Sequence, residues 1–327
     1  MPVRVAVVGA GYLGQHHTRV YAEMEGVDLV GVVDVDAARA GEVAGKYGSK
    51  AYTDYHDILS SADVLSIVVP TTSHYEVALD CIRARKDVLV EKPITVTVAQ
   101  ASELIDEAER MGRILQVGHL ERYNPGVIAL APMVKEPRFL EAIRISPFLR
   151  RGADVDVTLD LMIHDIDVIL SLVRSPIKTL RATGYSVVTD KIDEARAWIE
   201  FENGTVALLT ASRIEREKQR MLKVFQRNSC LELDYQLSEI RRYYHPSTAG
   251  REERPLGPST CDLKVEIRSE SDSGCAIDTI KPEYMEPLAR ELQEFIRCVT
   301  RRERPKVSGI EGRDALEVAL AINAVMR

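Results

Sequence analysis

The segment LDLMIHDID, residues 159–167, places three aspartates and one histidine in a stretch that is otherwise Leu, Ile and Met. If residues 159–173 form an α-helix, Asp160, His164, Asp167 and Ser171 fall within a band of about 60° on one side of it. Asp165 lies well away from that band. A narrow polar stripe on an apolar helix predicts a buried helix whose stripe faces a cavity. A histidine beside a carboxylate could serve there as a general base.

Each residue of this segment also has a structural interpretation. Asp160 could stabilise the helix dipole near the start of the helix, and His164 could be a core histidine with satisfied hydrogen bonds. Asp167 could be a solvated side chain. For Asp165 we favour a structural role over a catalytic one.

A second candidate group ends a predicted strand, in VEKP at residues 90–93. Glu91 and Lys92 would lie at the carboxyl edge of a parallel sheet, where open α/β folds bind ligands. A lysine ammonium there could bind a substrate hydroxyl and stabilise the alkoxide that develops as hydride leaves. The structural alternative is a lysine that is only solvated, which is common at strand ends.

A glycine-rich turn follows the first predicted strand, in VAVVGAGYLG at residues 5–14. Gly9 permits a tight turn, Gly11 lets backbone N–H groups approach a pyrophosphate, and Gly14 allows a helix to pack closely on the strand. Asp34, at the end of the next strand, would bind ribose hydroxyls and repel a 2′-phosphate. NAD is therefore favoured, and Arg39 leaves NADP as the less favoured cofactor. The other candidate cofactor contacts are Tyr12, Leu13, Pro70, Thr71, His74, Glu91 and Lys92.

The elements that must position these residues change in character near residue 121. Before it, helical patterns alternate with short runs that are apolar on both faces, at residues 3–9, 27–34, 64–70, 87–93 and 114–120. This pattern is typical of a doubly wound parallel sheet covered on each side. We expect a Rossmann domain over residues 1–121.

Strands without intervening helices follow in the second part of the chain. Residues 139–148 alternate, residues 195–213 carry a hairpin turn at Asn203-Gly204, and further strand-like runs lie at 221–235 and 238–244. We expect an α+β domain over residues 122–327, built on a large, mostly antiparallel open sheet. A homodimer or homotetramer would cover the open face of that sheet.

Two segments near the C-terminus have other patterns. Residues 246–281 are polar and turn-rich, which predicts a long excursion from the sheet. Residues 285–302 and 309–327 have helical patterns, and these helices could pack back on the Rossmann domain.

Composition excludes several classes of protein. The net charge of −7 gives no support to nucleic-acid binding, and no apolar run approaches the roughly 18 residues of a membrane span. Five cysteines without a C-x-x-C pair predict free thiols and no metal site. The sequence begins with a strand-like run in place of a secretory signal, so we expect a cytoplasmic protein.

The order of these motifs resembles the Gfo/Idh/MocA family over most of the chain. The motifs are G-x-G-x-x-G with its following aspartate, E-K-P, QVGHLERYNP at residues 116–125, and the D-x-x-x-H of Asp160 and His164. The resemblance implies NAD(P)-dependent oxidation or reduction of a sugar or cyclitol carbon, oligomers formed through the second domain, and catalytic roles for Lys92, Asp160 and His164. Arg122 and Asn124, where the two domains meet, are candidate substrate contacts.

These roles predict a mechanism of hydride transfer from a secondary carbinol to nicotinamide C4. His164 would accept the hydroxyl proton, Lys92 would orient the hydroxyl, and Asp160 would favour the charged or correctly oriented imidazole. Whether His164 or Lys92 takes the proton is left open by the sequence.

The segment before the predicted helix departs from the usual glycine-rich pattern of the family. SPFLRRGADVDVT, residues 146–158, is similar to members that oxidise UDP-N-acetylglucosamine at C3, which implies a 3-keto product for 3-amino sugar and lipid A synthesis. Arg150 and Arg151 would suit the phosphates of such a substrate, or could be solvated. The alternatives are a dehydrogenase of a free sugar, deoxysugar or inositol, and a non-catalytic NAD-binding sensor. The presence of Lys92, Asp160 and His164 together disfavours the sensor.

Overall fold

The computed structural model describes residues 2–148, 155–246, 263–272 and 274–326. The chain divides into two compact units. Unit 1 comprises Met1–Leu120 and Pro287–Leu316, and unit 2 comprises Glu121–Glu286 and Glu317–Arg327. Within the described ranges, no helix combines the length and the apolar character needed to cross a membrane.

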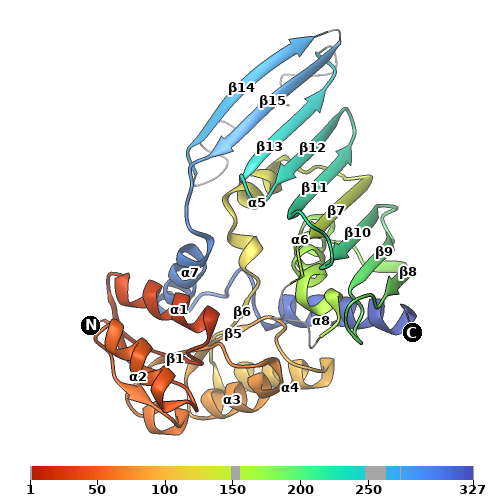
Figure 1. Ribbon diagram of the computed structural model, residues 1–327. Coiled ribbons are helices and arrows are strands. Elements are labelled where there is room, and N and C mark those ends of the chain that lie inside the picture. Colours follow the sequence, from red (N-terminus) through yellow and green to blue (C-terminus); the bar gives the residue numbers. More distant parts are fainter. Residues whose placement is uncertain (1, 149–154, 247–262, 273, 327) are drawn as a thin grey trace. The chain divides into compact units, whose positions relative to one another are not determined.

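Unit 1 is built on a six-stranded parallel sheet in the order β3-β2-β1-β4-β5-β6 (Figure 1). Five of these strands match the apolar runs predicted from the sequence, and the two-residue β3 was not predicted. The strands are β1 (Val3–Val8), β2 (Val27–Val33), β3 (Ala51–Tyr52), β4 (Val64–Ile67), β5 (Asp87–Glu91) and β6 (Leu115–Gly118).

Helices cover this sheet because its central strands are buried on both faces. On one face Leu292 and Phe295 of α7 pack with Tyr21 of α1 against Val5, Leu89 and neighbouring strand residues. The described helices of unit 1 are α1 (Tyr12–Glu23), α2 (Ala37–Lys46), η1 (Tyr55–Ile58), α3 (Thr71–Arg83), α4 (Val98–Met111) and α7 (Pro287–Arg301), together with the first part of α8 (Gly309–Met326).

Unit 2 is built on a nine-stranded sheet in the order β14-β15-β13-β12-β11-β7-β10-β9-β8 (Figure 1). Strands β7 and β10 run parallel, and every other described pair is antiparallel. The strands are β7 (Phe139–Ile145), β8 (Ile177–Tyr185), β9 (Glu194–Phe201), β10 (Val206–Ser212), β11 (Gln219–Gln226), β12 (Ser229–Asp234), β13 (Glu239–Tyr244), β14 (Val265–Asp272) and β15 (Cys275–Pro282).

Helix α6 (Ile163–Val173) packs on β7 and β10, and α5 (Pro125–Leu130) packs on β12, β13 and β15. The strand face under α6 carries small residues such as Ala142 and Ala211, which let the helix approach closely. The short helices of this unit are η2 (Leu120–Tyr123), η3 (Ala131–Met133) and η4 (Thr158–Met162).

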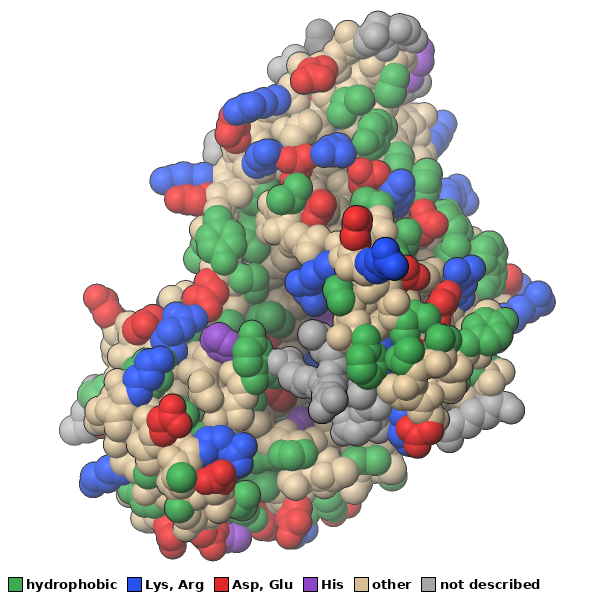
Figure 2. Space-filling view, viewed as in Figure 1, with side chains coloured by type: hydrophobic (Ala, Val, Ile, Leu, Met, Phe, Trp, Pro, Cys, Tyr) green, Lys and Arg blue, Asp and Glu red, His purple; other side chains and the backbone are tan. Residues whose placement is uncertain are grey.

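The other face of this sheet carries exposed aromatic and charged side chains. Phe139 lies between Trp198 and Phe225, with ring centroids 6.1 and 5.8 Å away. Along the neighbouring strands, Lys223 pairs with Glu232, and Arg241 pairs with Glu239. Figure 2 shows acidic and basic side chains interspersed among hydrophobic ones on the described part of the face in view.

These observations confirm the predicted fold class, and Gly204, with φ +83°, forms the turn expected between β9 and β10. The excursion expected over residues 246–281 is wrong for its second half, because β14 and β15 pair with each other and β15 joins β13. The sequence did not predict β15 because Asp278, a polar residue, occupies one of its buried positions. There Asp278 accepts hydrogen bonds from Ser269 and Tyr244. Residues 247–262 lie outside the described ranges.

Candidate active site

The glycine-rich turn between β1 and α1 has the geometry that dinucleotide binding requires. Gly9 has φ +103°, and a Cβ there would lie 2.4 Å from the Val68 carbonyl oxygen. A Cβ at Gly14 would lie 1.8 Å from the Gly9 carbonyl oxygen. At Gly11, by contrast, no described residue other than those next to it in the chain has an atom within 4 Å of the Cβ position. Packing therefore requires glycine at the first and third positions, whereas the second leaves open space for a ligand.

Asp34 connects the end of β2 to this turn. Its Oδ2 accepts a hydrogen bond from the Ala10 N–H at 2.8 Å, and its Oδ1 accepts one from the Asp36 N–H at 3.0 Å. Arg39 Nη2 lies 3.2 Å from the same Oδ1. The carboxylate therefore shapes the loop as well as presenting oxygens beside it. Tyr12 is exposed and Leu13 half-buried in the first turn of α1.

Glu91, at the end of β5, is held by a buried histidine from α1. His17 Nε2 lies 3.1 Å from Glu91 Oε1, and His17 Nδ1 lies 2.8 Å from Ser66 Oγ. A Cβ at Gly118 would lie 2.7 Å from Glu91 Oε1, so glycine on the adjacent strand leaves room for the carboxylate. Burial raises the Glu91 pKa, but the His17 hydrogen bond and the nearby charges outweigh it and hold the pKa below its ordinary value.

Lys92 follows directly, half-buried, and its backbone N–H donates to Glu91 Oε2 at 3.3 Å. The buried carboxylate thus fixes the backbone from which the lysine side chain leaves. These hydrogen bonds hold the Glu91 side chain against its own backbone and α1, and its contact with a cofactor stays a prediction.

His74 joins the start of α3 to the same turn. Its Nδ1 lies 2.8 Å from the Pro93 carbonyl oxygen and its Nε2 lies 2.9 Å from the Val69 carbonyl oxygen. The ring is buried, which lowers its pKa despite the carbonyl contacts. Both ring nitrogens of His74 thus face backbone carbonyls, and its contact with a cofactor stays a prediction. Pro70 is exposed and Thr71 half-buried at the start of α3, beside this link.

The helix that carries Asp160 and His164 is not uniformly α-helical. Residues 158–162 form the π-helical turn η4, which leads into α6 at Ile163. The regular α-helix expected over residues 159–173 is therefore wrong in its first turn. A π-turn contains more residues than an α-turn, so the step from Asp160 to His164 falls short of a full turn. Both side chains are half-buried.

The two other aspartates of this segment form ion pairs inside unit 2. Asp165 accepts two hydrogen bonds from Arg144, at 2.7 Å from Nε and 2.9 Å from Nη2. Asp167 accepts one from Arg122 Nη1 at 3.2 Å. Both aspartates are 2% exposed. Asp165 thus has the structural role that was expected, and Asp167 is paired instead of solvated.

Sequence reasoning missed Arg144 and Glu121. Arg144 is 1% exposed, and its Nη1 donates to Glu121 Oε1 at 2.8 Å. The sequence did contain a signal for Arg144. Every second residue of a strand lies on the same face, so Arg144 shares the buried face of β7 with Leu140 and Ala142.

A set of hydrogen bonds anchors the chain just before η4. Asp156 Oδ1 accepts from the Ile192 N–H at 2.9 Å, and Arg213 Nη1 donates to the Val155 carbonyl at 2.8 Å. Arg213 is itself paired with buried Asp193. Thr158 donates to Asn323 of α8. The start of the Asp160 helix is therefore fixed from several sides.

Of the predicted substrate contacts, Arg122 lies in η2 as the partner of Asp167. Asn124 is 5% exposed; its Oδ1 caps α5 at the Gly126 N–H, and its Nδ2 donates to Glu121 and to the Tyr235 carbonyl. These bonds occupy the amide, so we leave Asn124 out of the proposed site. Arg150 and Arg151 lie outside the described residues.

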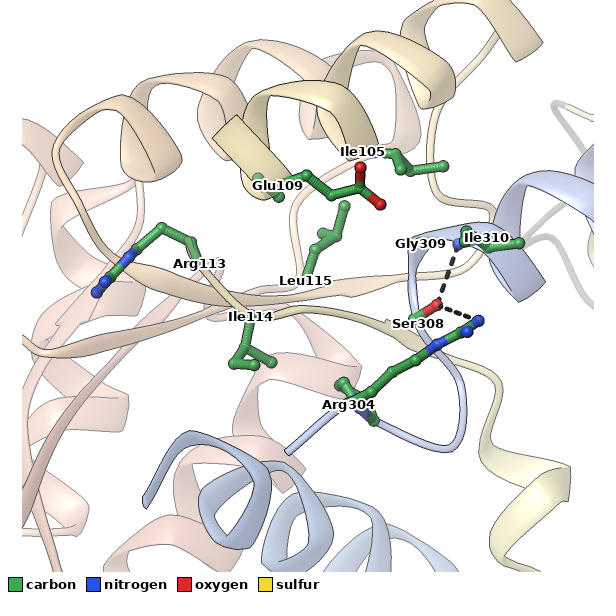
Figure 3. Close-up of a pocket in the computed structure, with 11 residues that line it drawn as sticks. Ile105, Glu109, Arg113, Ile114, Leu115, Arg304, Ser308, Gly309 and Ile310 are labelled. Carbon is green, nitrogen blue, oxygen red and sulfur yellow. Dashed lines mark hydrogen bonds between the residues drawn. The ribbon is translucent and has the colours of Figure 1, made fainter. Parts of the chain in front are cut away.

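A pocket of about 290 Å³ lies elsewhere on unit 1, between α4, β6 and the start of α8 (Figure 3). Glu109, Arg113, Leu115, Arg304 and Ser308 are among its lining residues. It contacts the start of β6, whereas parallel sheets bind dinucleotides at the carboxyl ends of their strands. This pocket is therefore separate from the glycine-rich turn.

Comparison with known proteins extends this picture to the whole chain. Residues 3–119 match a family described as "Oxidoreductase family, NAD-binding Rossmann fold" (GFO_IDH_MocA), and residues 138–230 match the "GFO/IDH/MocA C-terminal domain". The chain is 34% identical to UDP-N-acetylglucosamine 3-dehydrogenase from Acidithiobacillus ferrooxidans, over 99% of this chain and 97% of the relative. It is 29% identical to inositol 2-dehydrogenase from Salmonella paratyphi B, over 55% and 57%.

Solved structures agree with the sequence comparison. The Acidithiobacillus ferrooxidans enzyme superimposes with a TM-score of 0.89 at 33% identity, covering 99% of this chain and 97% of that one. A levoglucosan dehydrogenase in complex with NADH shares the fold alone, with a TM-score of 0.84 at 17% identity and coverage of 100% and 97%. The chain therefore belongs to the Gfo/Idh/MocA family of oxidoreductases, and its first unit is the NAD-binding Rossmann fold of that family.

Proposed function

We propose that this oxidoreductase oxidises the C3 hydroxyl of UDP-N-acetylglucosamine to a 3-keto sugar with NAD as hydride acceptor. The observation that carries the proposal is similarity over the whole chain, at 34% identity, to a relative named for this reaction. The relative matches unit 2 as well as the Rossmann fold. Inositol 2-dehydrogenase from Salmonella paratyphi B, in contrast, aligns with only 55% of the chain.

Three side chains carry the chemistry in this proposal. His164 accepts the proton of the C3 hydroxyl as general base, and Asp160, in the preceding turn, stabilises the imidazolium that forms. The Lys92 ammonium donates to the same oxygen and stabilises its developing negative charge. Bound nicotinamide supplies the carbon that accepts the hydride. Arg122, and Arg150 and Arg151 before the helix, are proposed substrate contacts.

The residues of the glycine-rich turn fit a dinucleotide, and we assign NAD over NADP. The open space at Gly11 would admit the pyrophosphate against the start of α1. The Asp34 carboxylate would accept hydrogen bonds from the ribose and repel a 2′-phosphate. The Arg39 charge is already engaged by Asp34 and Asp36. The remaining proposed contacts are Gly9, Tyr12, Leu13, Gly14, Pro70 and Thr71.

The proposal extends to assembly and to the place of the reaction. The aromatic cluster of half-buried Phe139 with exposed Trp198 and Phe225 supports a homodimer or homotetramer formed through the open face of the unit 2 sheet. The cysteines of the described residues are free thiols, which supports a cytoplasmic location. A 3-keto product is the substrate an aminotransferase needs, so we place the enzyme before such a step in lipid A synthesis.

NADH formation measured with a panel of UDP-sugars, free sugars, deoxysugars and inositol tests the assignment. We expect turnover with UDP-N-acetylglucosamine and a 3-keto product identified by mass spectrometry. Preferred turnover of a free sugar or inositol would reject the nucleotide-sugar substrate. NAD binding without turnover on any member of the panel would reject catalysis on these substrates and favour a sensor.

A further inference from the structure

Two arginines lie directly opposite each other on the α6 face of the unit 2 sheet. Arg220 of β11 is the register partner of Arg144 of β7, and opposed residues of paired strands point to the same face. Like charges in this position repel, so the pair requires anions nearby. Asp165 and Glu121 provide them, and both bind Arg144 closely.

Arg220 is much less completely paired than Arg144. Its Nη1 lies 3.7 Å from Glu121 Oε1, beyond hydrogen-bonding distance, and that oxygen already accepts from Arg144. Its Nε is buried and has no hydrogen-bond partner among the described residues. The side chain as a whole is 31% exposed, so Arg220 is only partly withdrawn from solvent. A partly desolvated arginine with unused donors is a binding group for a planar or phosphate anion.

A further positive charge lies beside it. Lys218, two residues earlier in the chain, is exposed, and the Arg220 charge, followed by partial burial, lowers its pKa. Burial, followed by the Arg144 charge, lowers the pKa of Arg220. Asp160 acts on Arg220 in the opposite direction, so Arg220 lies within electrostatic range of the proposed catalytic pair. An anionic group bound here would relieve the repulsion among the three cations.

We propose that Arg220, with Lys218 beside it, forms the subsite for the diphosphate of the nucleotide-sugar substrate. The inference rests on the proposed function, and it assigns this recognition to described residues of β11 and the segment before it. The Arg220 guanidinium binds the diphosphate oxygens through its fork, and Lys218 adds a solvent-exposed charge. The sugar attached to that diphosphate would then extend toward Asp160 and His164.

Calorimetric titration of the NAD-loaded enzyme with UDP and with uridine tests the subsite. Arg220→Met should weaken UDP binding at least about tenfold, the usual effect of losing a charge-assisted hydrogen bond, and leave uridine binding unchanged. Lys218→Met should weaken UDP binding about threefold, as expected for an exposed charge. The matched control is Lys223→Met, on the same strand with the same 31% exposure, but on the opposite face and paired with Glu232. It should leave both affinities unchanged.

Melting temperatures, together with a second substitution, separate binding from folding. Arg220→Gln keeps two N–H donors but removes the charge, and should also lose UDP affinity. Lys218 is exposed, so Lys218→Met reports on binding even if Arg220 variants unfold. Parent-like UDP affinity in Arg220→Gln and Lys218→Met, or equal weakening of UDP and uridine, overturns the subsite. If the parent oxidises UDP-N-acetylglucosamine while these variants bind UDP normally, the subsite alone fails. A parent that does not bind UDP at all rejects the subsite and the nucleotide-sugar substrate together.

Discussion

The Asp34 carboxylate accepts a hydrogen bond from the Ala10 N–H at 2.8 Å, and so ties the end of β2 to the turn that begins α1. One carboxylate therefore shapes the phosphate-binding loop and presents negative charge beside it.

Asp34→Asn should shift cofactor preference toward NADP. The amide keeps the size of the side chain but removes the charge that repels a 2′-phosphate, and it releases Arg39 to bind that phosphate. We expect the ratio of kcat/KM for NADP to that for NAD to rise at least about tenfold, equivalent to about 1.4 kcal/mol. Asp36→Asn is the matched control, because Asp36 also contacts Arg39 but caps α2. An unchanged ratio in Asp34→Asn would show that Asp34 does not select the cofactor.

His164→Asn and Lys92→Met should each lower turnover by about two to four orders of magnitude and leave NAD affinity unchanged. Each variant removes a group that acts on the hydroxyl oxygen, not one that holds the dinucleotide. Ser171→Ala is the control on the same helix, because Ser171 Oγ donates to the Val168 carbonyl. Turnover comes from NADH absorbance and NAD affinity from calorimetry. Parent-like turnover in either variant would refute its assignment.

Glu91→Gln should destabilise the protein by about 1–3 kcal/mol at neutral pH, because the amide cannot reproduce a buried carboxylate that accepts from His17 and Lys92. The folded-state pKa of Glu91 is lowered, so its stabilising effect is present above the ordinary value of 4.5 and is lost as pH falls through the folded pKa. The difference in melting temperature between parent and variant should therefore shrink as the pH falls from about 4.5 downward. A difference that does not vary with pH would mean that the carboxylate is not ionised in the fold. Turnover should also fall, since Lys92 leaves from the backbone that Glu91 holds.

Asp165→Asn should cost about 3–5 kcal/mol of unfolding free energy, because it leaves Arg144 charged and buried without its bidentate partner. Urea denaturation monitored by circular dichroism measures this loss. Replacing both residues, as Arg144→Met with Asp165→Leu, should cost less than the single change, since no unpaired charge remains. Glu266→Gln, in an exposed ion pair of β14, should have no measurable effect. An Asp165→Asn variant as stable as the parent would contradict a stabilising role for the pair.

The sequence was sufficient to predict the elements whose pattern repeats locally. Five strands of unit 1 and the β9–β10 hairpin follow from apolar runs and from one Asn-Gly turn. The glycine-rich turn was predicted because its glycine spacing forms a known motif directly after a strand. The structure adds that Val68, far away in the chain, leaves no room for a side chain at Gly9.

The features that the sequence did not yield depend on contacts between distant segments. The hydrogen-bond partners of Glu91 and His74 lie 74 and 19 residues away in the chain, so the sequence could not reveal them. The π-turn at η4 has no periodic signature, and in the edge strand β14 the alternation of apolar and charged residues stops after Arg268. The periodicity of a sequence predicts which face of a helix or strand a side chain lies on, but not which residues it contacts there.

The parallel pairing of β7 with β10 in an otherwise antiparallel sheet has a topological consequence. Antiparallel neighbours can be joined by a short turn, but a parallel strand is reached only by carrying the chain back across the sheet. Strand β8 runs in the same direction as β7, because β10 is parallel to β7 and β9 is antiparallel to both β10 and β8. The connection from β7 to β8 makes this crossing, and η4 and α6 form its helical part. The connectivity of the sheet, before any side chain is considered, thus obliges the chain to cross one face of it, and Asp160 and His164 lie on the helical part of that crossing.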